Sequence, residues 1–152
     1  MEKTVLDVCC GGKMFWFNKQ DTRALFVDNR TVPSVIPDDP FCISPDKECD
    51  FRYLPFGDDK WPLVVFDPPH MRHPGVMGVK YGKLSSTWKD DLRRGFEECF
   101  RVLKPLGTLV FKWNESEIPL KDVLALSPHP PLFGNRRSKT IWMVFQKPEM
   151  GA

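Results

Sequence analysis

The sequence predicts an α/β fold built on one open, mainly parallel β-sheet. Short apolar runs rich in β-branched and aromatic residues recur along the chain, and stretches that favour helix or turn separate them. Several runs are apolar at consecutive positions, which is typical of strands whose two faces are both covered. Strands that alternate with helices in this way favour a parallel sheet, because each crossover returns the chain to the same edge.

Local patterns predict the individual elements. The predicted strands are 4–10, 24–28, 50–54, 63–67, 108–113 and 140–147. The best helix is predicted over 86–103, where apolar residues recur at steps of three and four and form one face. Shorter helices are expected over 13–20, after a Gly-Gly turn, and over 118–126. Four prolines within 29–49 leave little room for a crossover helix, so this segment is expected to form an ordered excursion on the surface.

The composition limits the class of protein. A chain of 152 residues suits a single domain, here 1–152, with a real hydrophobic core. A net charge of +2 gives no global basic field, so any surface for nucleic acid must be local. The five cysteines include no Cys-x-x-Cys pair, so we expect free thiols and no metal site. The start shows no signal peptide and no apolar run approaches roughly 18 residues, so we expect a cytoplasmic protein without membrane contact.

The stretch "FDPPH", residues 66–70, is the most unusual feature of the chain. It ends an apolar run, and its two prolines cannot donate hydrogen bonds to a sheet, so the strand must stop there. A turn alone would require neither a carboxylate before the prolines nor a planar ring after them. Asp67, Pro68, Pro69 and His70 are therefore the first candidates for a catalytic site.

Further candidates lie where other predicted strands end, and in a parallel sheet these ends share one edge. Gly11 and Gly12 permit a tight turn with close backbone approach to a ligand, and Asp7 is an acceptor in the strand before them. Asp28 ends the second strand, where an acid can bind ribose hydroxyls. Each group also fits a plain structural role, as a glycine turn or a turn carboxylate, and that alternative stays open here.

Two more groups are expected at the same edge. The carboxylate of Asp50 can accept from an adenine amino group while the ring of Phe51 contacts the base, although a turn acid beside a core aromatic explains the pair equally well. Residues 112–115, "KWNE", end the strand predicted over 108–113. They either line the same cleft or form a solvated strand end.

Taken together, "LDVCCGG" followed by "FDPPH" resembles the class I S-adenosylmethionine-dependent methyltransferases. More narrowly, it resembles the small single-domain amino-methyltransferases of bacteria and phages that carry an Asp/Asn-Pro-Pro-aromatic signature. This group methylates exocyclic amines of adenine or cytosine in DNA or RNA and, in one branch, a glutamine amide in a protein. The resemblance implies a minimal Rossmann-like fold, with a mostly parallel seven-stranded sheet flanked by helices, and S-adenosyl-L-methionine as cofactor.

The resemblance assigns roles residue by residue. The implied cofactor-binding residues are Asp7, Cys9, Cys10, Gly11, Gly12, Asp28, Asp50, Phe51 and Asp67. The implied catalytic residues are Asp67, Pro68, Pro69 and His70. The sequence departs from the family at two places. Lys13 stands where the family has the third glycine of its first loop, and His70 stands where it has Tyr, Phe or Trp, which leaves a substrate other than a base open.

The chemistry explains the signature. The lone pair of an exocyclic amine is delocalised into its ring, and two acceptors aimed at the amine protons would localise it on nitrogen. The Asp67 carboxylate and the Pro68 carbonyl would supply these acceptors, and Pro69 would fix the direction of that carbonyl. A base inside a duplex cannot reach such a pocket, so it must be flipped out or already single-stranded.

The expected function is therefore methyl transfer to an exocyclic amine of a nucleic-acid base, with adenine in DNA favoured over cytosine or RNA. One alternative is a methyltransferase for a protein amide or a small-molecule amine. Another is a cofactor-binding partner subunit without catalysis of its own. The chain has little room for a target-recognition domain. We therefore expect one of three arrangements: low sequence specificity, specificity from loops 29–49 and 71–85, or specificity from a partner subunit or homodimer.

Local positive charge follows the catalytic loop. Residues 72–104 carry eight Lys and Arg against four Asp and Glu, and 136–139 form a second basic cluster. Gly75, Gly78 and Gly82 predict a mobile flap over the substrate. These segments would bind phosphates, or they form an ordinary solvated surface.

Overall fold

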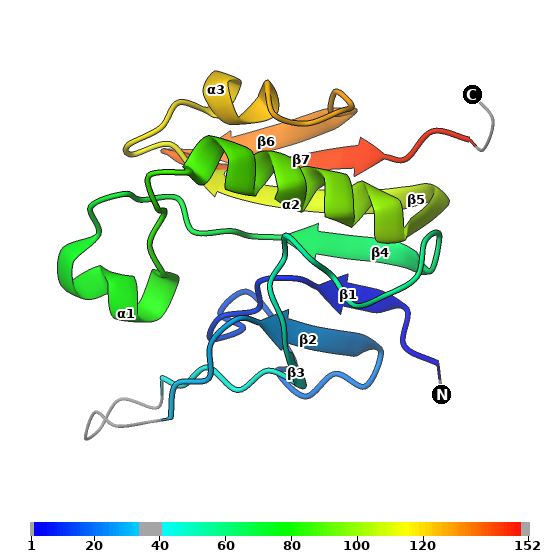
Figure 1. Cartoon of the computed structure of the whole chain (residues 1–152), viewed down its shortest axis with the longest axis horizontal. Coiled ribbons are helices and arrows are strands. Elements are labelled where there is room, and N and C mark those ends of the chain that lie inside the picture. The colour runs from blue at the N-terminus through cyan, green and yellow to red at the C-terminus, as the bar shows by residue number, and fades with distance from the viewer. Residues whose placement is uncertain (1, 34–40, 150–152) are drawn as a thin grey trace.

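The computed structural model describes residues 2–33 and 41–149, which form a seven-stranded sheet in the order β3-β2-β1-β4-β5-β7-β6 (Figure 1). The strands are β1 (Val5–Asp7), β2 (Ala24–Asp28), β3 (Lys47–Glu48), β4 (Trp61–Phe66), β5 (Leu103–Asn114), β6 (Phe133–Arg137) and β7 (Thr140–Gln146). β7 runs antiparallel to both of its neighbours, β5 and β6, and the other neighbouring pairs are parallel. The predicted mixed α/β fold with a mostly parallel sheet is confirmed.

One long helix, α2 (Trp88–Val102), covers the middle of the sheet. Its apolar face is the one that the sequence predicts over 86–103, and the side chains on it, including Leu92 and Phe96, are buried. Gly95 lets the helix approach closely, because a Cβ atom there would lie 2.6 Å from the Phe66 ring. The shorter elements are a 3-10 turn (Gly75–Met77), α1 (Gly78–Tyr81) and α3 (Leu120–Leu124), the last within the helix predicted over 118–126.

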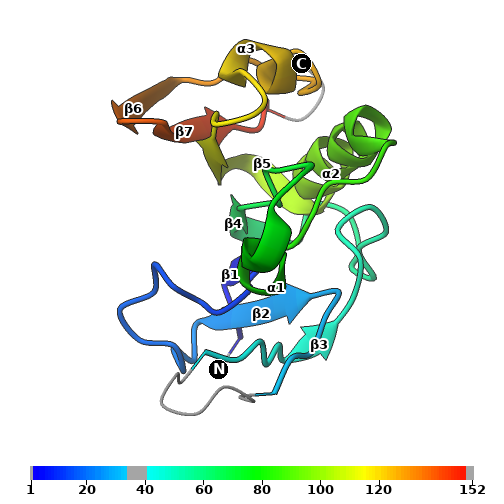
Figure 2. The ribbon, with the colours of Figure 1, turned by 90° about the vertical axis from the view of Figure 1, so that its left-hand side faces the viewer.

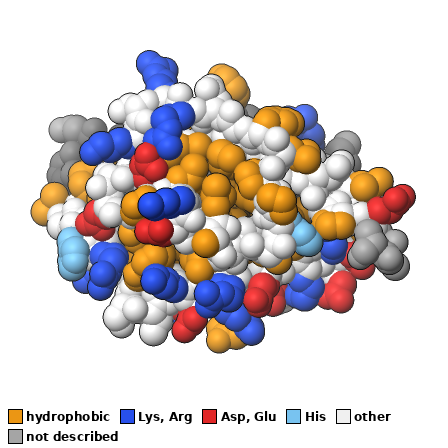
Figure 3. Space-filling model, turned by 90° about the horizontal axis from the view of Figure 1, so that it is seen from above, with side chains coloured by type: hydrophobic (Ala, Val, Ile, Leu, Met, Phe, Trp, Pro, Cys, Tyr) orange, Lys and Arg blue, Asp and Glu red, His pale blue; other side chains and the backbone are white. Residues whose placement is uncertain are grey.

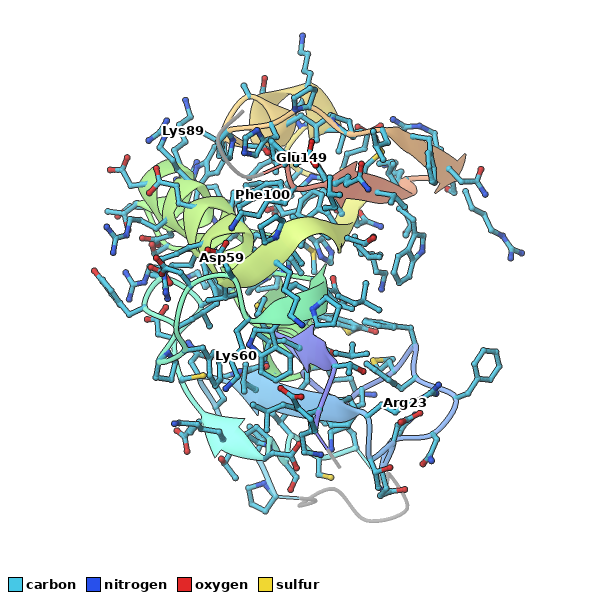
Figure 4. The ribbon with its side chains drawn as sticks, turned by 90° about the vertical axis from the view of Figure 1, so that its right-hand side faces the viewer. Arg23, Asp59, Lys60, Lys89, Phe100 and Glu149 are labelled. Atoms are coloured by element: carbon cyan, nitrogen blue, oxygen red, sulfur yellow. The ribbon has the colours of Figure 1, made fainter. Side chains whose placement is uncertain are left out.

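The core beneath α2 is aromatic. Phe96 of α2 lies with its ring centroid 5.3 Å from that of Phe66 on β4 and 4.9 Å from that of Phe111 on β5. Phe100, which points from α2 toward the sheet in Figure 4, lies 5.9 Å from Phe145 on β7. This closed, apolar side fixes the positions of the central strands.

The other face of the sheet is covered differently. Cys10, Ala24 and Phe26 form a small separate cluster there, with Trp16 packed against it. The cover is the irregular loop between β1 and β2, seen in Figure 2 on the opposite side of the sheet from α2. Strand register places Asp7 on this face, because it pairs with Phe26. The strand ends that carry the candidate acids therefore emerge beside a loop rather than beneath a helix.

The helix expected over 13–20 does not form, and the expectation was wrong. Gly11 and Lys13 have positive φ angles of 50° and 56°, in the left-handed region where a right-handed helix cannot continue. The segment folds instead into successive turns, with the Lys13 amide donating to the Cys10 carbonyl and the Trp16 amide to the Lys13 carbonyl.

The strand expected over 50–54 is also wrong, because a turn replaces it. The Arg52 amide donates to the Asp50 carboxylate at 2.9 Å, and the Tyr53 amide donates to the Asp50 carbonyl. Such local side-chain bonding competes with strand pairing. The third strand is instead the two-residue β3. It lies within the excursion expected over 29–49 and pairs with β2. Residues 34–40 of that excursion lie outside the described residues.

β6 is an edge strand that no strand prediction included. All five of its residues are exposed, and Phe133 is 63% exposed.

Viewed from above the orientation of Figure 1, hydrophobic side chains gather near the middle of the surface with Lys and Arg side chains beside them (Figure 3). No helix in the described part of the chain is long and apolar enough to cross a membrane.

Candidate active site

A cavity of about 430 Å³ opens at the carboxyl edge of the parallel strands. Its size falls within the range of about 300–1,000 Å³ that is typical of small-molecule sites. Ten sequence-predicted residues line it: Cys9, Cys10, Gly11, Gly12, Asp28, Phe51, Asp67, Pro68, Pro69 and His70. Asp7 and Asp50 are not among the lining residues. The fold thus gathers residues from four separate segments around one space.

The loop after β1 brings its backbone close to the cavity. Gly11 adopts a φ of 50°, and its amide donates to the Asp28 carboxylate at 2.9 Å. A Cβ atom on Gly12 would lie 2.8 Å from the Phe41 ring, so any larger residue here would require that ring to shift. Lys13 turns away from the cavity, with its ammonium 4.2 Å from the centroid of the Phe26 ring.

Asp7 lies beneath this loop and is fully buried. The indole N–H of Trp16 donates to its carboxylate at 2.8 Å, and the Cys9 amide donates at 3.4 Å. Burial raises the pKa of Asp7 to about 7, with the nearby charge of Asp67 adding to the shift. Asp7 therefore supports the loop from below, and Trp16 is the partner that sequence reasoning missed.

Asp28 ends β2 at the cavity wall and is only 7% exposed. One carboxylate oxygen accepts from the Gly11 amide and the other accepts from the Arg30 amide at 3.0 Å. The Arg30 guanidinium reaches across to the carbonyls of Gly78 and Val79 at 3.3 and 3.1 Å. Arg30, which was not singled out from the sequence, thus joins the end of β2 to α1.

Two residues after β3, Asp50 and Phe51, were expected at the cavity, and only Phe51 lines it. Asp50 pairs with Arg52 at 2.7 Å, and this hydrogen-bonded partner lowers the pKa of the Asp50 carboxyl. Phe51 does line the cavity, and its ring packs edge-on against Phe66 with centroids 5.3 Å apart. The structure brings the ring, but not the carboxylate, to the cavity wall.

The catalytic candidates lie at the end of β4. Asp67 is half-buried, and its carboxylate lies 3.7 Å from the ammonium of Lys112 on β5. Burial raises the pKa of Asp67 to about 6, and the Lys112 charge offsets part of that shift. Pro68 and Pro69 continue the wall, and Pro69 packs so closely on Gly82 that a Cβ atom there would lie 3.0 Å from the proline ring.

His70 forms an aromatic wall together with two other rings. Its centroid lies 6.4 Å from that of Tyr81 and 6.2 Å from that of Trp113. Burial lowers the pKa of His70, and the positive charge of Lys112 lowers it further. Both effects favour the neutral form of the imidazole.

A flap, residues 71–83, lies beside the cavity and is fastened at both ends. At its start, Glu117 accepts from the amides of Arg72 and His73. At its end, the Leu84 amide donates to the Met71 carbonyl at 2.8 Å. Of the three predicted flap glycines, Gly75 and Gly82 have positive φ angles.

The described residues contain no group of three or more His, Cys, Asp and Glu side chains arranged to hold a metal ion.

Several lining residues had only a weak sequence signal or none. Lys112 and Asn114 belong to the "KWNE" segment, for which lining the cleft was one of two alternatives. Lys80 and Lys83 were noted only as local positive charge, and both line the cavity. Thr140 enters from β7 because antiparallel pairing places it opposite Asn114, a neighbourhood that no local pattern encodes.

Comparison with known proteins identifies the fold. No protein-family model and no curated protein matches the chain. An S-adenosylmethionine-dependent methyltransferase from Methanosarcina mazei aligns with a TM-score of 0.62 at 13% identity, covering 97% of this chain and 93% of that one. The N1-methyltransferase of Burkholderia thailandensis, solved with 1,6-didemethyltoxoflavin and S-adenosylhomocysteine, aligns with a TM-score of 0.55 at 14% identity, covering 97% and 72%.

A third similar structure comes from Haloferax volcanii, in a complex between the Trm112 methyltransferase activator and a putative methyltransferase. It aligns with a TM-score of 0.57 at 14% identity and covers 100% of this chain and 86% of that one. The strand order, the antiparallel β7 and these alignments agree with one another. The chain therefore has the fold of the class I S-adenosylmethionine-dependent methyltransferases.

Proposed function

We propose that the protein is an S-adenosylmethionine-dependent methyltransferase that acts on an exocyclic amine of a nucleic-acid base, with adenine in DNA favoured over cytosine or RNA. One observation carries the proposal. The Asp67 carboxylate, followed by two prolines, lines the same cavity as the glycine loop after β1 and the acid at the end of β2. A methyl donor and an amine would then meet in one space.

The residues present fit this cofactor. Gly11 and Gly12 line the cavity and bring the backbone of this loop close to it, so the loop would hold the methionine part. Asp28 would hold the ribose hydroxyls, and Phe51 would contact the adenine. Asp50 is engaged by Arg52, so its predicted contact with adenine requires that pair to open. The cofactor supplies an electrophilic methyl group.

The chain's own groups act on the amine. Asp67 and the Pro68 carbonyl would accept hydrogen bonds from its two N–H groups, which localises the nitrogen lone pair and stabilises the positive charge that develops there. The methylated nitrogen then loses its surplus proton. The prolines hold these acceptors still, and positioning of this kind supplies much of the rate enhancement. A carboxylate with a pKa of about 6 is ionised at neutral pH, so no stronger base is required.

The rim of the cavity favours a polyanionic substrate. Arg30, Lys80 and Lys83 line it on the side of the flap. A base carried on a single strand, or flipped from a duplex, would enter with its phosphates beside these cations. The neutral ring of His70 would stack on the base, an interaction worth about 1–3 kcal/mol per base.

Specific observations favour two other functions. The similar Burkholderia enzyme is solved with a small heterocyclic ligand, and a cavity of about 430 Å³ also suits such a molecule. A small-molecule amine or protein amide is therefore the second candidate. The similar Haloferax complex includes an activator, which keeps a partner subunit, or a role as a non-catalytic subunit, as the third.

The test offers radiolabelled S-adenosylmethionine with single-stranded DNA, duplex DNA, RNA and protein in separate reactions. We expect label in nucleic acid, and a loss of about 100-fold or more with Asp67→Ala. Asp90→Ala is the matched control, because Asp90 is an exposed carboxylate on α2 paired with Arg93. Label only in protein or in a small heterocycle supports the second candidate, and transfer that survives Asp67→Ala contradicts the mechanism.

A further inference from the structure

The side chain of Lys112 occupies an unusual position for a strand lysine. Lys112 lines the cavity, its ammonium lies 3.7 Å from the Asp67 carboxylate, and neither side chain is fully buried. The same ammonium lies 5.6 Å from the ring centroids of both Phe15 and Trp142. The cation is thus held over the catalytic candidate by two aromatic rings instead of extending into solvent.

The sheet imposes this position. β4 and β5 are in register at Phe66 and Phe111, so the following residues, Asp67 and Lys112, are neighbours at the carboxyl edge. Across the antiparallel pair, Lys112 lies opposite Trp142. Phe15 reaches over from the loop after β1 and meets Trp142 edge-on at 5.2 Å. Three segments therefore converge to fix the lysine stem.

The pair presents two different hydrogen-bonding groups to a ligand. Asp67 is an acceptor, and Lys112 is a donor only. Neighbouring acceptor and donor atoms in one plane match a ligand edge on which an N–H group adjoins an acceptor atom. Asn and Gln side chains read the amino group and ring nitrogen of adenine bidentately in this way. Here the acceptor and the donor come from two strands.

We infer that Lys112 determines substrate class by donating a hydrogen bond to the acceptor atom beside the reacting amine, so that the cavity selects an amidine or amide edge such as those of adenine, cytosine or a carboxamide. This inference rests on the proposed function. It goes beyond that function because it assigns recognition of the substrate edge to a residue outside the "FDPPH" loop. Lys112 contributes mainly to substrate binding, whereas Asp67 and Pro68 act on the amine itself.

The experiment compares methylation of short single-stranded oligonucleotides that each contain one adenine, one 1-deazaadenine or one 7-deazaadenine. The analogues keep the amine and remove one ring nitrogen each. With Lys112→Met, we expect kcat/KM on adenine to fall about tenfold or more, mostly through KM. On the analogue that lacks the recognised nitrogen, the wild-type protein and Lys112→Met should differ less than twofold when both are assayed at a pH above the midpoint of each activity profile, where Asp67 is ionised in both. If label enters cytosine, cytosine and 3-deazacytosine form the corresponding pair.

Two variants control this comparison. Lys112→Arg keeps a donor and should recover most of the discrimination between adenine and its analogue. Lys60→Met removes an exposed lysine that also lies 5.6 Å from an indole ring, that of Trp61, but at the amino end of β4, and it should leave activity on every substrate unaffected. Thermal unfolding of each variant establishes that it is folded at the assay temperature.

The outcomes separate the inference from the proposed function. An equal loss with Lys112→Met on adenine and on all analogues contradicts the inference, because it means that Lys112 only positions Asp67. Loss of S-adenosylhomocysteine binding by Lys112→Met in calorimetry also contradicts it, since the lysine would then serve the cofactor. Wild-type protein that methylates none of the oligonucleotides contradicts the proposed function, and the inference with it.

Discussion

The two faces of the sheet differ in almost every physical respect. The face under α2 is closed by aromatic side chains packed edge-on or tilted against one another, among them Phe66, Phe96 and Phe111, and all three are fully buried. The opposite face carries Asp7 in β1 and, at the carboxyl edge, Lys112 beside Asp67. One face therefore supplies most of the free energy of folding, and this free energy holds the costly buried acids in place on the other face.

The largest expected effect is on the closed face. Phe96→Ala removes a ring that contacts three other phenylalanines, and it should lower the free energy of unfolding by about 3–5 kcal/mol. Phe17→Ala is the matched control, because that ring is fully exposed and its loss should change stability by less than about 0.5 kcal/mol.

Chemical denaturation measures both variants. At a temperature where Phe96→Ala is still folded, its methyl transfer should stay within about twofold of the wild type, since the ring does not touch the cavity. A large loss of activity in fully folded protein would show that the two faces are not separable.

An intermediate effect is expected on the open face, with the opposite sign. Asp7→Asn keeps an acceptor for the Trp16 indole and removes a carboxyl whose pKa is raised to about 7. Because the unfolded chain loses this proton first, wild-type stability falls as pH rises from about 4 to about 7. The variant should therefore be more stable by up to about 4 kcal/mol at about pH 8 and equal near pH 3.5.

Thermal or urea unfolding at both pH values checks this expectation, with Asp90→Asn as the exposed control. Destabilisation of Asp7→Asn at the higher pH would mean that the buried carboxylate is ionised and stabilising. Burial of this carboxylate would then not lower the free energy of unfolding.

The smallest expected effect is the pH dependence of wild-type activity. Asp67 must be ionised to accept from the amine, and its pKa is raised to about 6. The kcat/KM of methyl transfer should rise through about pH 6, reach half its maximum there and level off above about pH 7. Lys112→Met should move the midpoint upward, because the lysine charge lowers this pKa. A flat profile across this range would contradict the assignment.

The closed face was more predictable from sequence than the open one. The apolar period of α2 and the apolar strands β2 and β4 are local signals, and each element formed close to its predicted bounds. The 13–20 helix failed because Lys13 takes a left-handed conformation, and the 50–54 strand failed because Asp50 bonds to Arg52. In both of these segments, side chains form hydrogen bonds to nearby backbone or side-chain groups. They do not pack at the regular spacing of a helix or a strand.

The candidate site was predictable where a motif was local. The "FDPPH" stretch and the Gly-Gly turn could be recognised directly, and both line the cavity. The neighbourhood of Asp67 and Lys112 depends on the register of two strands whose paired residues lie about 45 positions apart in the chain, a separation that no local window of sequence spans. Arg30 likewise acquires its role through carbonyls of the distant flap.

The reliance of the core on α2 has a consequence for how the chain folds during synthesis. The first strands bury Leu6, Val8 and Val27 in the same cluster as Phe96 and Phe100 of the helix. Until residue 102 has been made, these strands have no long helix to pack against. The amino-terminal half must therefore wait on the ribosome with this apolar face of its strands uncovered, and contacts this distant in sequence form slowly. A fragment ending before α2 would expose the very surface on which the domain is built.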